Sequence, residues 1–157
     1  MLNRNRGIVI LLALYLALLL NISVCSSDLD SEKSDFLVLI NQYRQDHGVG
    51  TLKISGALTT AAQLHSEDMA TNDYFAHNSQ DGRTPIDRMR AAGYNYNTWY
   101  GENIAAGQTT AQQVFDDWRG SPSHNEIMLS PSFVVIGIGL AYDASSTYKW
   151  YWTTDFG

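Results

Sequence analysis

The chain has 157 residues, of which 45% are hydrophobic and 17% are charged, a balance that fits one folded domain with a targeting segment and excludes a long disordered tract. Its 16 acidic and 10 basic residues give a net charge of −6 at pH 7. Because an acidic surface repels phosphate backbones and anionic lipid surfaces, this charge argues against nucleic acid as a partner and favours divalent cations.

Residues 1–25 have the pattern of a secretory signal peptide. Arg4 and Arg6 precede an uncharged apolar run over residues 8–20, which is shorter than the roughly 20 residues of a comfortable membrane span. We therefore expect a protein secreted to the extracellular space or held in the cell envelope, with anchoring in the membrane by the uncleaved segment as the alternative. Removing residues 1–25 takes away two bases and no acids, so the remaining domain carries a net charge of −8.

Cys25 is the only cysteine, so no internal disulfide is possible. It lies where a bacterial lipoprotein carries its lipidated cysteine, but Val24 is bulky where that signal needs a small residue. Cleavage after Cys25 is therefore the simpler interpretation, and lipidation of Cys25 is the alternative, in which a lipid anchor would hold the protein at the membrane. Residues 26–34 are polar and predict a short tether before a domain over residues 35–157.

The first half of the domain predicts three helices. The first covers residues 35–47, and the second covers residues 57–72 with an apolar stripe at helical spacing that places His65 on the buried face. The third opens with Thr84 as N-cap and Asp87 as the partner in a capping box, and it ends before Gly93.

The second half alternates between strands and helices. Residues 94–100 are aromatic and β-prone, and a strand is expected through residues 102–105. Thr110 with Gln113 predicts a capping box for the next helix, and Ser121 predicts the N-cap of a short helix that has His124 in its first turn and ends near Leu129. Two alternating strands follow, over residues 133–142 and 148–154, joined by a loop over residues 143–146. A small antiparallel sheet covered by helices on both faces gives an α+β fold with α-β-α layers.

Six segments in this order resemble the CAP superfamily, which contains the cysteine-rich secretory proteins, antigen 5 and the pathogenesis-related proteins, and they are most similar to its bacterial SCP-like branch. They cover most of residues 35–157 and read AAQLHSEDMA, YFAHNSQDG, GENIAAG, VFDDWRGSPSHNEIML, FVVIGIGLAY and WYWTTDFG. The resemblance implies a monomeric three-layer α-β-α sandwich with a cleft in which two histidines and two glutamates can bind a divalent metal.

The resemblance assigns the cleft histidines to His77 and His124 and one glutamate to Glu102. The position of the second glutamate is occupied by Ser121. The usual SPGHR segment reads SPSHN here, without its glycine and arginine, and the disulfides of the eukaryotic members are absent. The cleft of this chain is therefore expected to contain three of the four residues.

Two imidazoles and a carboxylate would leave an open coordination position on Zn²⁺ or Ca²⁺ for water or substrate. A position near a helix N-terminus disfavours the protonated ring of His124, and a neutral ring is the form that binds metal. Alternatively, His77, Glu102 and His124 only hold loops together through hydrogen bonds. His65 is better explained as a buried histidine next to the cleft than as a ligand, because it belongs to an apolar helical stripe.

Three functions remain open. The first is a binding module for a divalent metal and a small-molecule, lipid or glycan ligand, since lipid binding occurs within the family that the chain resembles. The second is a metal-assisted hydrolase in which His77, His124 and Glu102 are catalytic, with Glu102 as general base. The third is a structural interaction domain with an inert cleft.

Two other catalytic sites are disfavoured. Two observations argue against a serine hydrolase triad of Ser121, His124 and Glu102. Ser121 is expected to be an N-cap, and the chain has no Gly-x-Ser-x-Gly segment. The zinc-protease sequence His-Glu-x-x-His is absent as well. A few aromatic residues at the cleft rim could stack on sugar, but core packing is the simpler expectation for the set of Tyr94, Tyr96, Trp99, Tyr100, Tyr148, Trp150 and Trp152.

Overall fold

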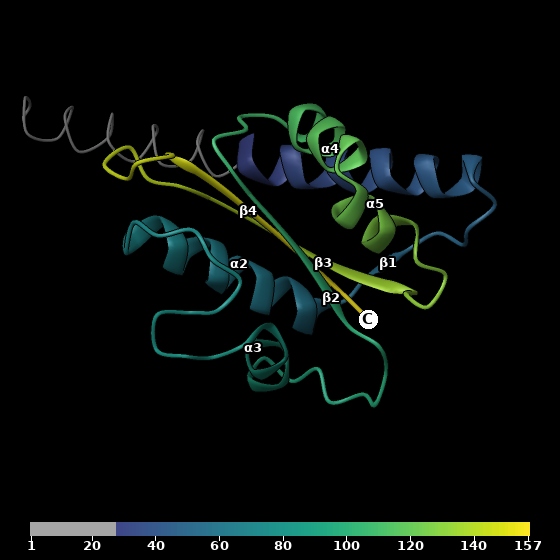
Figure 1. Cartoon of the computed structure of the whole chain (residues 1–157), viewed down its shortest axis with the longest axis horizontal. Coiled ribbons are helices and arrows are strands. Elements are labelled where there is room, and N and C mark those ends of the chain that lie inside the picture. Colours follow the sequence, from purple (N-terminus) through teal and green to yellow (C-terminus); the bar gives the residue numbers. More distant parts are fainter. Residues whose placement is uncertain (1–27) are drawn as a thin grey trace, which may run out of the picture. The chain divides into compact units, whose positions relative to one another are not determined.

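The computed structural model describes residues 28–157 (Figure 1), so the predicted signal peptide and Cys25 lie outside the described residues. A helix covers residues 28–46, and the compact unit that holds the rest of the fold is Glu32–Gly157. Residues 28–34, which were predicted to be a tether, are therefore helical. None of the helices in the described part of the chain combines the length and the apolar character that a membrane crossing requires.

The remaining elements alternate between strands and helices. In chain order they are β1 (Lys53–Ile54), α2 (Gly56–Thr71), α3 (Pro85–Ala91), β2 (Gly101–Ala106), α4 (Ala111–Gly120), α5 (Pro122–Leu129), β3 (Val135–Tyr142) and β4 (Trp150–Phe156). The predicted capping box between Thr84 and Asp87 begins α3. At α4 only half of the predicted box forms, because the side chain of Gln113 accepts from Thr109 and not from Thr110.

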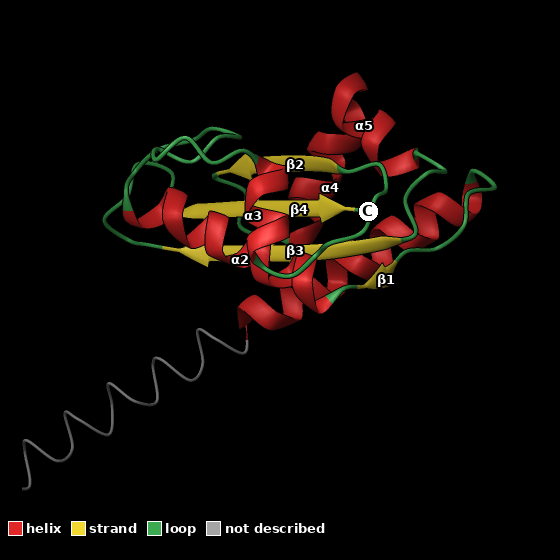
Figure 2. Ribbon diagram, turned by 90° about the horizontal axis from the view of Figure 1, so that it is seen from below, coloured by secondary structure: helices red, strands yellow, loops and turns green. Residues whose placement is uncertain are grey.

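The sheet has the strand order β1-β3-β4-β2 (Figure 2). The strands β3, β4 and β2 are antiparallel, as predicted. The fourth strand, β1, was not predicted; it pairs parallel to β3, so the sheet is mixed. A strand of two residues is too short to show the alternation on which the prediction depended.

The predicted strand character of residues 94–100 is also wrong, because this segment is a loop that leads into β2. Tyr94 anchors the loop in the core, while Tyr96, Trp99 and Tyr100 are exposed, as is Tyr148 near β4. Core packing was therefore the wrong expectation for these four aromatic side chains. The two asparagines and the threonine among them favour a turn over a strand.

Helices cover both faces of the sheet, which confirms the predicted α-β-α layers (Figure 1). On one face, α2 lies directly against β3. The approach is so close that a Cβ atom at Gly137 would be 2.0 Å from the carbonyl carbon of Leu58. Gly139 has the same relation to Ala62, at 2.3 Å. The absence of side chains at both glycines is thus a condition for the contact between this helix and the sheet.

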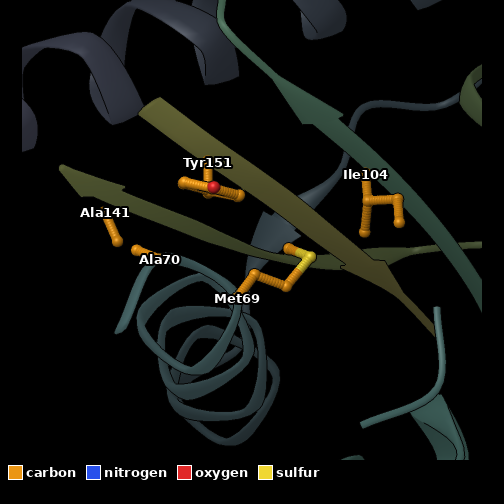
Figure 3. Packing of buried hydrophobic residues seen from close by; sticks show 5 residues of the cluster. All are labelled: Met69, Ala70, Ile104, Ala141 and Tyr151. Carbon is orange, nitrogen blue, oxygen red and sulfur yellow. The ribbon is translucent and has the colours of Figure 1, made fainter. Parts of the chain in front are cut away.

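Part of the core between α2 and the sheet is a cluster to which four elements contribute (Figure 3). Met69 and Ala70 come from α2, and they pack with Ile104 of β2, Ala141 of β3 and Tyr151 of β4. Because these side chains come from far apart in the sequence, the cluster fixes the position of β2 relative to α2. The loop that follows α2 therefore starts from a well-defined point against the sheet.

On the opposite face, Arg44 of the first helix fixes the end of α5. This side chain is buried, and it donates hydrogen bonds to the carbonyl oxygens of Gly50, Met128, Ser130 and Phe133. A guanidinium with four of its five N–H donors occupied tolerates burial far better than an unpaired charge. Arg44 thereby holds in place the short helix that carries His124.

Candidate functional site

A cleft of about 500 Å³ lies along β2, which is an edge strand of the sheet. The strand forms its floor, the loop after α2 forms one wall, and the junction of α4 with α5 forms the other. The residues that line it are Phe75, Ala76, His77, Ile104, Ala105, Ala106, Gln108, Asp117, Trp118, Ser121 and His124. The two predicted histidines are therefore in one cleft, although 46 residues separate them in the sequence.

His77 is held by a buried ion pair. Its Nδ1 lies 2.7 Å from Oε1 of Glu102, and Oε2 of Glu102 lies 2.5 Å from Nη2 of Arg88. The side chains of Glu102 and Arg88 are only 3% and 4% exposed. Because both carboxylate oxygens are occupied, Glu102 orients His77 and does not line the cleft itself.

Arg88 also holds the loop that carries His77. Its Nη1 donates to the carbonyl oxygen of His77 at 2.8 Å, and to Arg83 and Ser79 at 3.3 and 3.4 Å. One guanidinium of α3 therefore connects the wall of the cleft to Glu102 of β2. Arg88 was not predicted as a site residue, because nothing in a short capped helix shows which of its two arginines points inward.

Asp155 of β4 lies opposite Glu102 of β2 in the sheet register. It is fully buried, and within residues 28–157 no group other than Glu102 is within hydrogen-bond reach of its oxygens. Burial raises the pKa of Asp155 well above its usual value, and the negative charge of Glu102 raises it further. Asp155 is therefore best described as a neutral acid behind the ion pair. An acid within the alternating pattern of β4 was the sequence signal that could have revealed it.

His124 is oriented by Ser121. Its Nδ1 lies 2.7 Å from Oγ of Ser121, and its ring is stacked on Trp118 with 6.1 Å between centroids. The expected N-cap hydrogen bond of Ser121 is wrong, because its side chain makes no bond to the helix N–H groups. The hydroxyl bonds to the imidazole of His124 instead of to the amides of the first turn.

The pKa of His124 depends on its burial and on His77, which lines the same cleft. Burial lowers the pKa of His124, and the electrostatic influence of His77 lowers it further. His124 is therefore neutral near pH 7. Both rings make their hydrogen bonds through Nδ1. Within the described residues neither Nε2 has a hydrogen-bond partner, so both Nε2 atoms are available to a ligand of the cleft.

The other predicted site residues lie elsewhere. His65 is buried between α2 and α3 and does not line the cleft. The serine hydrolase arrangement is absent, since Glu102 bonds His77 and not His124. In the part of the chain that the structure describes, no group of three or more His, Cys, Asp or Glu side chains is arranged to hold a metal ion. A cleft metal would thus have two histidines as protein ligands, with Glu102 supporting one of them.

The family of the chain follows from a family model. The model described as the cysteine-rich secretory protein family, CAP, matches residues 37–156. The chain belongs to the CAP family. Among curated proteins, this CAP domain is similar to the uncharacterized protein YkwD of Bacillus subtilis, with 35% identity over 130 residues that cover 83% of the chain and 48% of the relative. It is also similar to the uncharacterized membrane protein YlbC of the same organism, with 31% identity over 110 residues, 70% of the chain and 31% of the relative. The chain thus spans less than half of the curated relatives that it matches.

Two solved structures have the same fold. An extracellular protein from Bacillus anthracis that contains a SCP domain matches with a TM-score of 0.71 and 28% identity, over 81% of this chain and 40% of the other. An outer surface protein from Borrelia burgdorferi matches with a TM-score of 0.74 and 21% identity, over 81% and 92% of the two chains. The family model, the Bacillus subtilis relatives and the SCP-domain protein from Bacillus anthracis confirm the predicted bacterial SCP-like branch.

Proposed function

We propose that this CAP domain is an exported binding module whose cleft holds a divalent metal ion through Nε2 of His77 and Nε2 of His124. The observation that carries the proposal is the anchoring of both rings through Nδ1, to Glu102 at 2.7 Å and to Ser121 at 2.7 Å. Metal-binding histidines characteristically use the second ring nitrogen in this way, which fixes the ring and its tautomer.

The donor set suits a metal ion such as Zn²⁺. A carboxylate only accepts hydrogen bonds, so Nδ1 of His77 carries the proton and Nε2 of the neutral ring has a free lone pair. The lowered pKa of His124 keeps that ring neutral as well, and neutral imidazole is the form that coordinates. Two imidazoles favour zinc over calcium, because calcium prefers oxygen ligands. The metal would contribute Lewis acidity and a positive charge to the cleft.

The cleft also has room for an organic ligand beside the metal. Its volume of about 500 Å³ lies within the range of small-molecule sites. Much of its wall is apolar, with Phe75, Ile104 and Trp118 among the lining residues. A lipid chain or the apolar face of a sugar suits such a wall better than a highly charged molecule does.

Calorimetric titration of the metal-stripped protein with Zn²⁺ and Ca²⁺ tests the proposal. The wild type is expected to bind one Zn²⁺, and both His77→Ala and His124→Ala are expected to lose this binding. His47→Ala is the matched control, because His47 is exposed and does not line the cleft. Equal binding heats in wild type, His77→Ala and His124→Ala would refute the metal site.

A hydrolase remains the second candidate, because a carboxylate that orients a histidine is also how general bases are arranged. The geometry changes the role that was predicted for Glu102. Its carboxylate is buried and fully paired, so His77 would be the base and Glu102 would orient it. Turnover of cell-wall, ester or peptide substrates that is lost in Glu102→Gln would favour the enzyme, and its absence across broad panels would favour the binding module.

Export is part of the proposal. It is supported by the signal-like pattern of residues 1–25 and by the similar SCP-domain protein from Bacillus anthracis, which is named as extracellular. Mass spectrometry of the native N-terminus, after separating medium, envelope and cytoplasm, tests this part. A start after Cys25 in the medium indicates secretion, a lipidated Cys25 indicates an anchor, and an intact N-terminus in the cytoplasm would refute export.

A further inference from the structure

The floor of the cleft is an open edge of the sheet. In the strand order β1-β3-β4-β2, the strand β2 has a neighbouring strand on one side only (Figure 2). Three consecutive residues of this strand, Ile104, Ala105 and Ala106, line the cleft. The register between β2 and β4 shows which of their backbone groups bond to β4 and which point away from it.

Alternate residues of β2 direct their backbone groups to the open side. Gly107 donates its N–H to the carbonyl oxygen of Trp150 at 2.9 Å, in the register that pairs β2 with β4. In an antiparallel pair, residues that exchange hydrogen bonds alternate with residues that do not. Ala105 therefore bonds to β4, while the N–H and C=O groups of Ile104 and Ala106 point away from it.

Only one of these four outward groups has a partner within residues 28–157. The carbonyl oxygen of Ile104 accepts from Nε1 of Trp118 at 3.3 Å, which confirms that it faces the open side. The N–H of Ile104 and both backbone groups of Ala106 have no partner there. An edge strand with an unpaired N–H beside an unpaired C=O is a template for pairing with another extended chain.

The walls of the cleft limit what can pair with this edge. The loop after α2 lies on one side of β2 and the junction of α4 with α5 lies on the other, and they contribute Phe75 and Trp118 to the lining. Such walls keep a second sheet away from the edge, but they leave room for one extended chain. The side chains of that chain would alternate between the two walls, which are largely apolar at these residues.

The charges of the cleft favour a neutral or basic chain. Asp117 is the acidic residue among those that line the cleft, and it is exposed. The domain that follows residue 25 carries a net charge of −8. An acidic peptide would therefore be repelled, whereas a lysine or arginine side chain would find a partner in Asp117.

We propose that the cleft recognises an extended peptide without acidic residues, which adds to the sheet as a further strand beside β2. The peptide backbone would pair with the N–H of Ile104 and with both groups of Ala106, and a basic side chain would lie near Asp117. In this mode of recognition the main-chain hydrogen bonds supply affinity and alternate side chains supply specificity. The inference rests on the proposed function in that the cleft is a binding site, but it does not require the metal ion.

A positional-scanning library of N-acetylated tetrapeptide amides tests the proposal. Amide NMR spectra of metal-stripped, ¹⁵N-labelled protein are expected to show saturable shifts in β2 with pools that contain lysine or arginine. In the peptide that binds best, N-methylation of the residues that face β2 is expected to weaken binding about tenfold, because each methyl group removes a hydrogen bond. N-methylation of the intervening residues is expected to have little effect.

Ala106→Pro makes the corresponding change in the protein. It removes the N–H that points away from β4, and an edge strand tolerates proline where the N–H does not belong to the ladder. Peptide affinity is expected to fall about tenfold. Ile54→Pro is the matched control at the opposite edge of the sheet. The N–H groups of Lys53 and Ser55 bond to β3, so that of Ile54 points outward, and Ile54 does not line the cleft. This variant is expected to bind the peptide as the wild type does.

Three results would overturn the inference. If every pool stayed silent up to about 5 mM while Zn²⁺ still bound, the metal site would stand and the peptide site would not. Equal effects of N-methylation at all positions, or an unchanged affinity in Ala106→Pro, would show that the backbone of β2 is not the recognition element. Shifts of the β2 signals with N-acetylated chitotriose but with no peptide pool would assign the edge to the acetamido groups of a glycan. Peptide binding without Zn²⁺ binding would support the inference and remove only the metal.

Discussion

Replacing Arg88 with methionine is the most informative test of how the cleft is held together. The substitution keeps a long, flexible side chain but removes the guanidinium, and with it the hydrogen bonds to Glu102, His77, Arg83 and Ser79. Glu102 would remain as a buried carboxylate without its cation. Removing one partner of a buried ion pair typically costs about 3–5 kcal/mol of stability.

We therefore expect Arg88→Met to lower the free energy of unfolding by about 4 kcal/mol. For a domain of this size such a loss corresponds to a fall in Tm of about 10–15 °C. Zn²⁺ affinity is expected to fall as well, by about 10- to 100-fold, because the carboxylate that orients His77 loses its own support. Urea denaturation and calorimetric metal titration measure the two effects.

Arg90→Met is the matched control, since Arg90 lies on the same helix but is exposed. Its effect on stability is expected to stay within about 0.5 kcal/mol. If Arg88→Met were within about 1 kcal/mol of the wild type, the buried ion pair would not have the role assigned to it. A large loss of stability with unchanged Zn²⁺ affinity would show instead that Arg88 supports the fold but not the site.

Three further predictions concern single side chains. Gly137→Ala is expected to cost about 3 kcal/mol in urea denaturation, because its Cβ would overlap the backbone of α2. Gly56→Ala, which meets nothing within 4 Å, should be neutral or slightly stabilising, and equal effects of the two changes would contradict the packing argument. Burial raises the pKa of Asp155, so the folded protein binds this proton more tightly than the unfolded chain, and wild-type stability falls as pH rises from about 3.8 towards the folded pKa. In thermal denaturation from pH 3 to 8, Asp155→Asn should therefore gain stability relative to the wild type as pH rises, and a difference independent of pH would be evidence against a neutral Asp155. Ser121→Ala is expected to weaken Zn²⁺ binding about tenfold in calorimetry, with Ser123→Ala unchanged, and equal affinities would mean that Ser121 does not orient His124.

Much of the fold could be predicted from local patterns. The helix that begins at Pro85 shows its start in the capping residues Thr84 and Asp87, and β3 shows its apolar alternation directly. The strand β1 could not be predicted, because its two residues pair with β3 only through the tertiary fold. The loop over residues 94–100 was mistaken for a strand, since aromatic residues favour strands only when a neighbouring strand and a core are present.

The site was predictable in its location but not in its connections. The motifs around His77 and His124 predict a shared cleft, and both side chains line it. What could not be read from the motifs is that Glu102 faces inward to Arg88 and Asp155, because these contacts depend on how α3 and β4 pack against β2. The role of Ser121 was missed for a related reason, since a serine before a helix usually caps it, and only the position of the imidazole shows the competing partner.

Gly137 and Gly139, the two positions of β3 without a side chain, also affect the geometry of the cleft. They let α2 lie in backbone contact with the sheet, and the segment that leaves α2 carries His77 to the edge of β2. The gap between the two imidazoles is thus governed in part from the middle of the sheet, by the absence of two methyl groups. Substitutions at these glycines would change the spacing of the two imidazoles without changing any residue that lines the cleft. The sheet interior and the binding properties of this domain are therefore expected to evolve together.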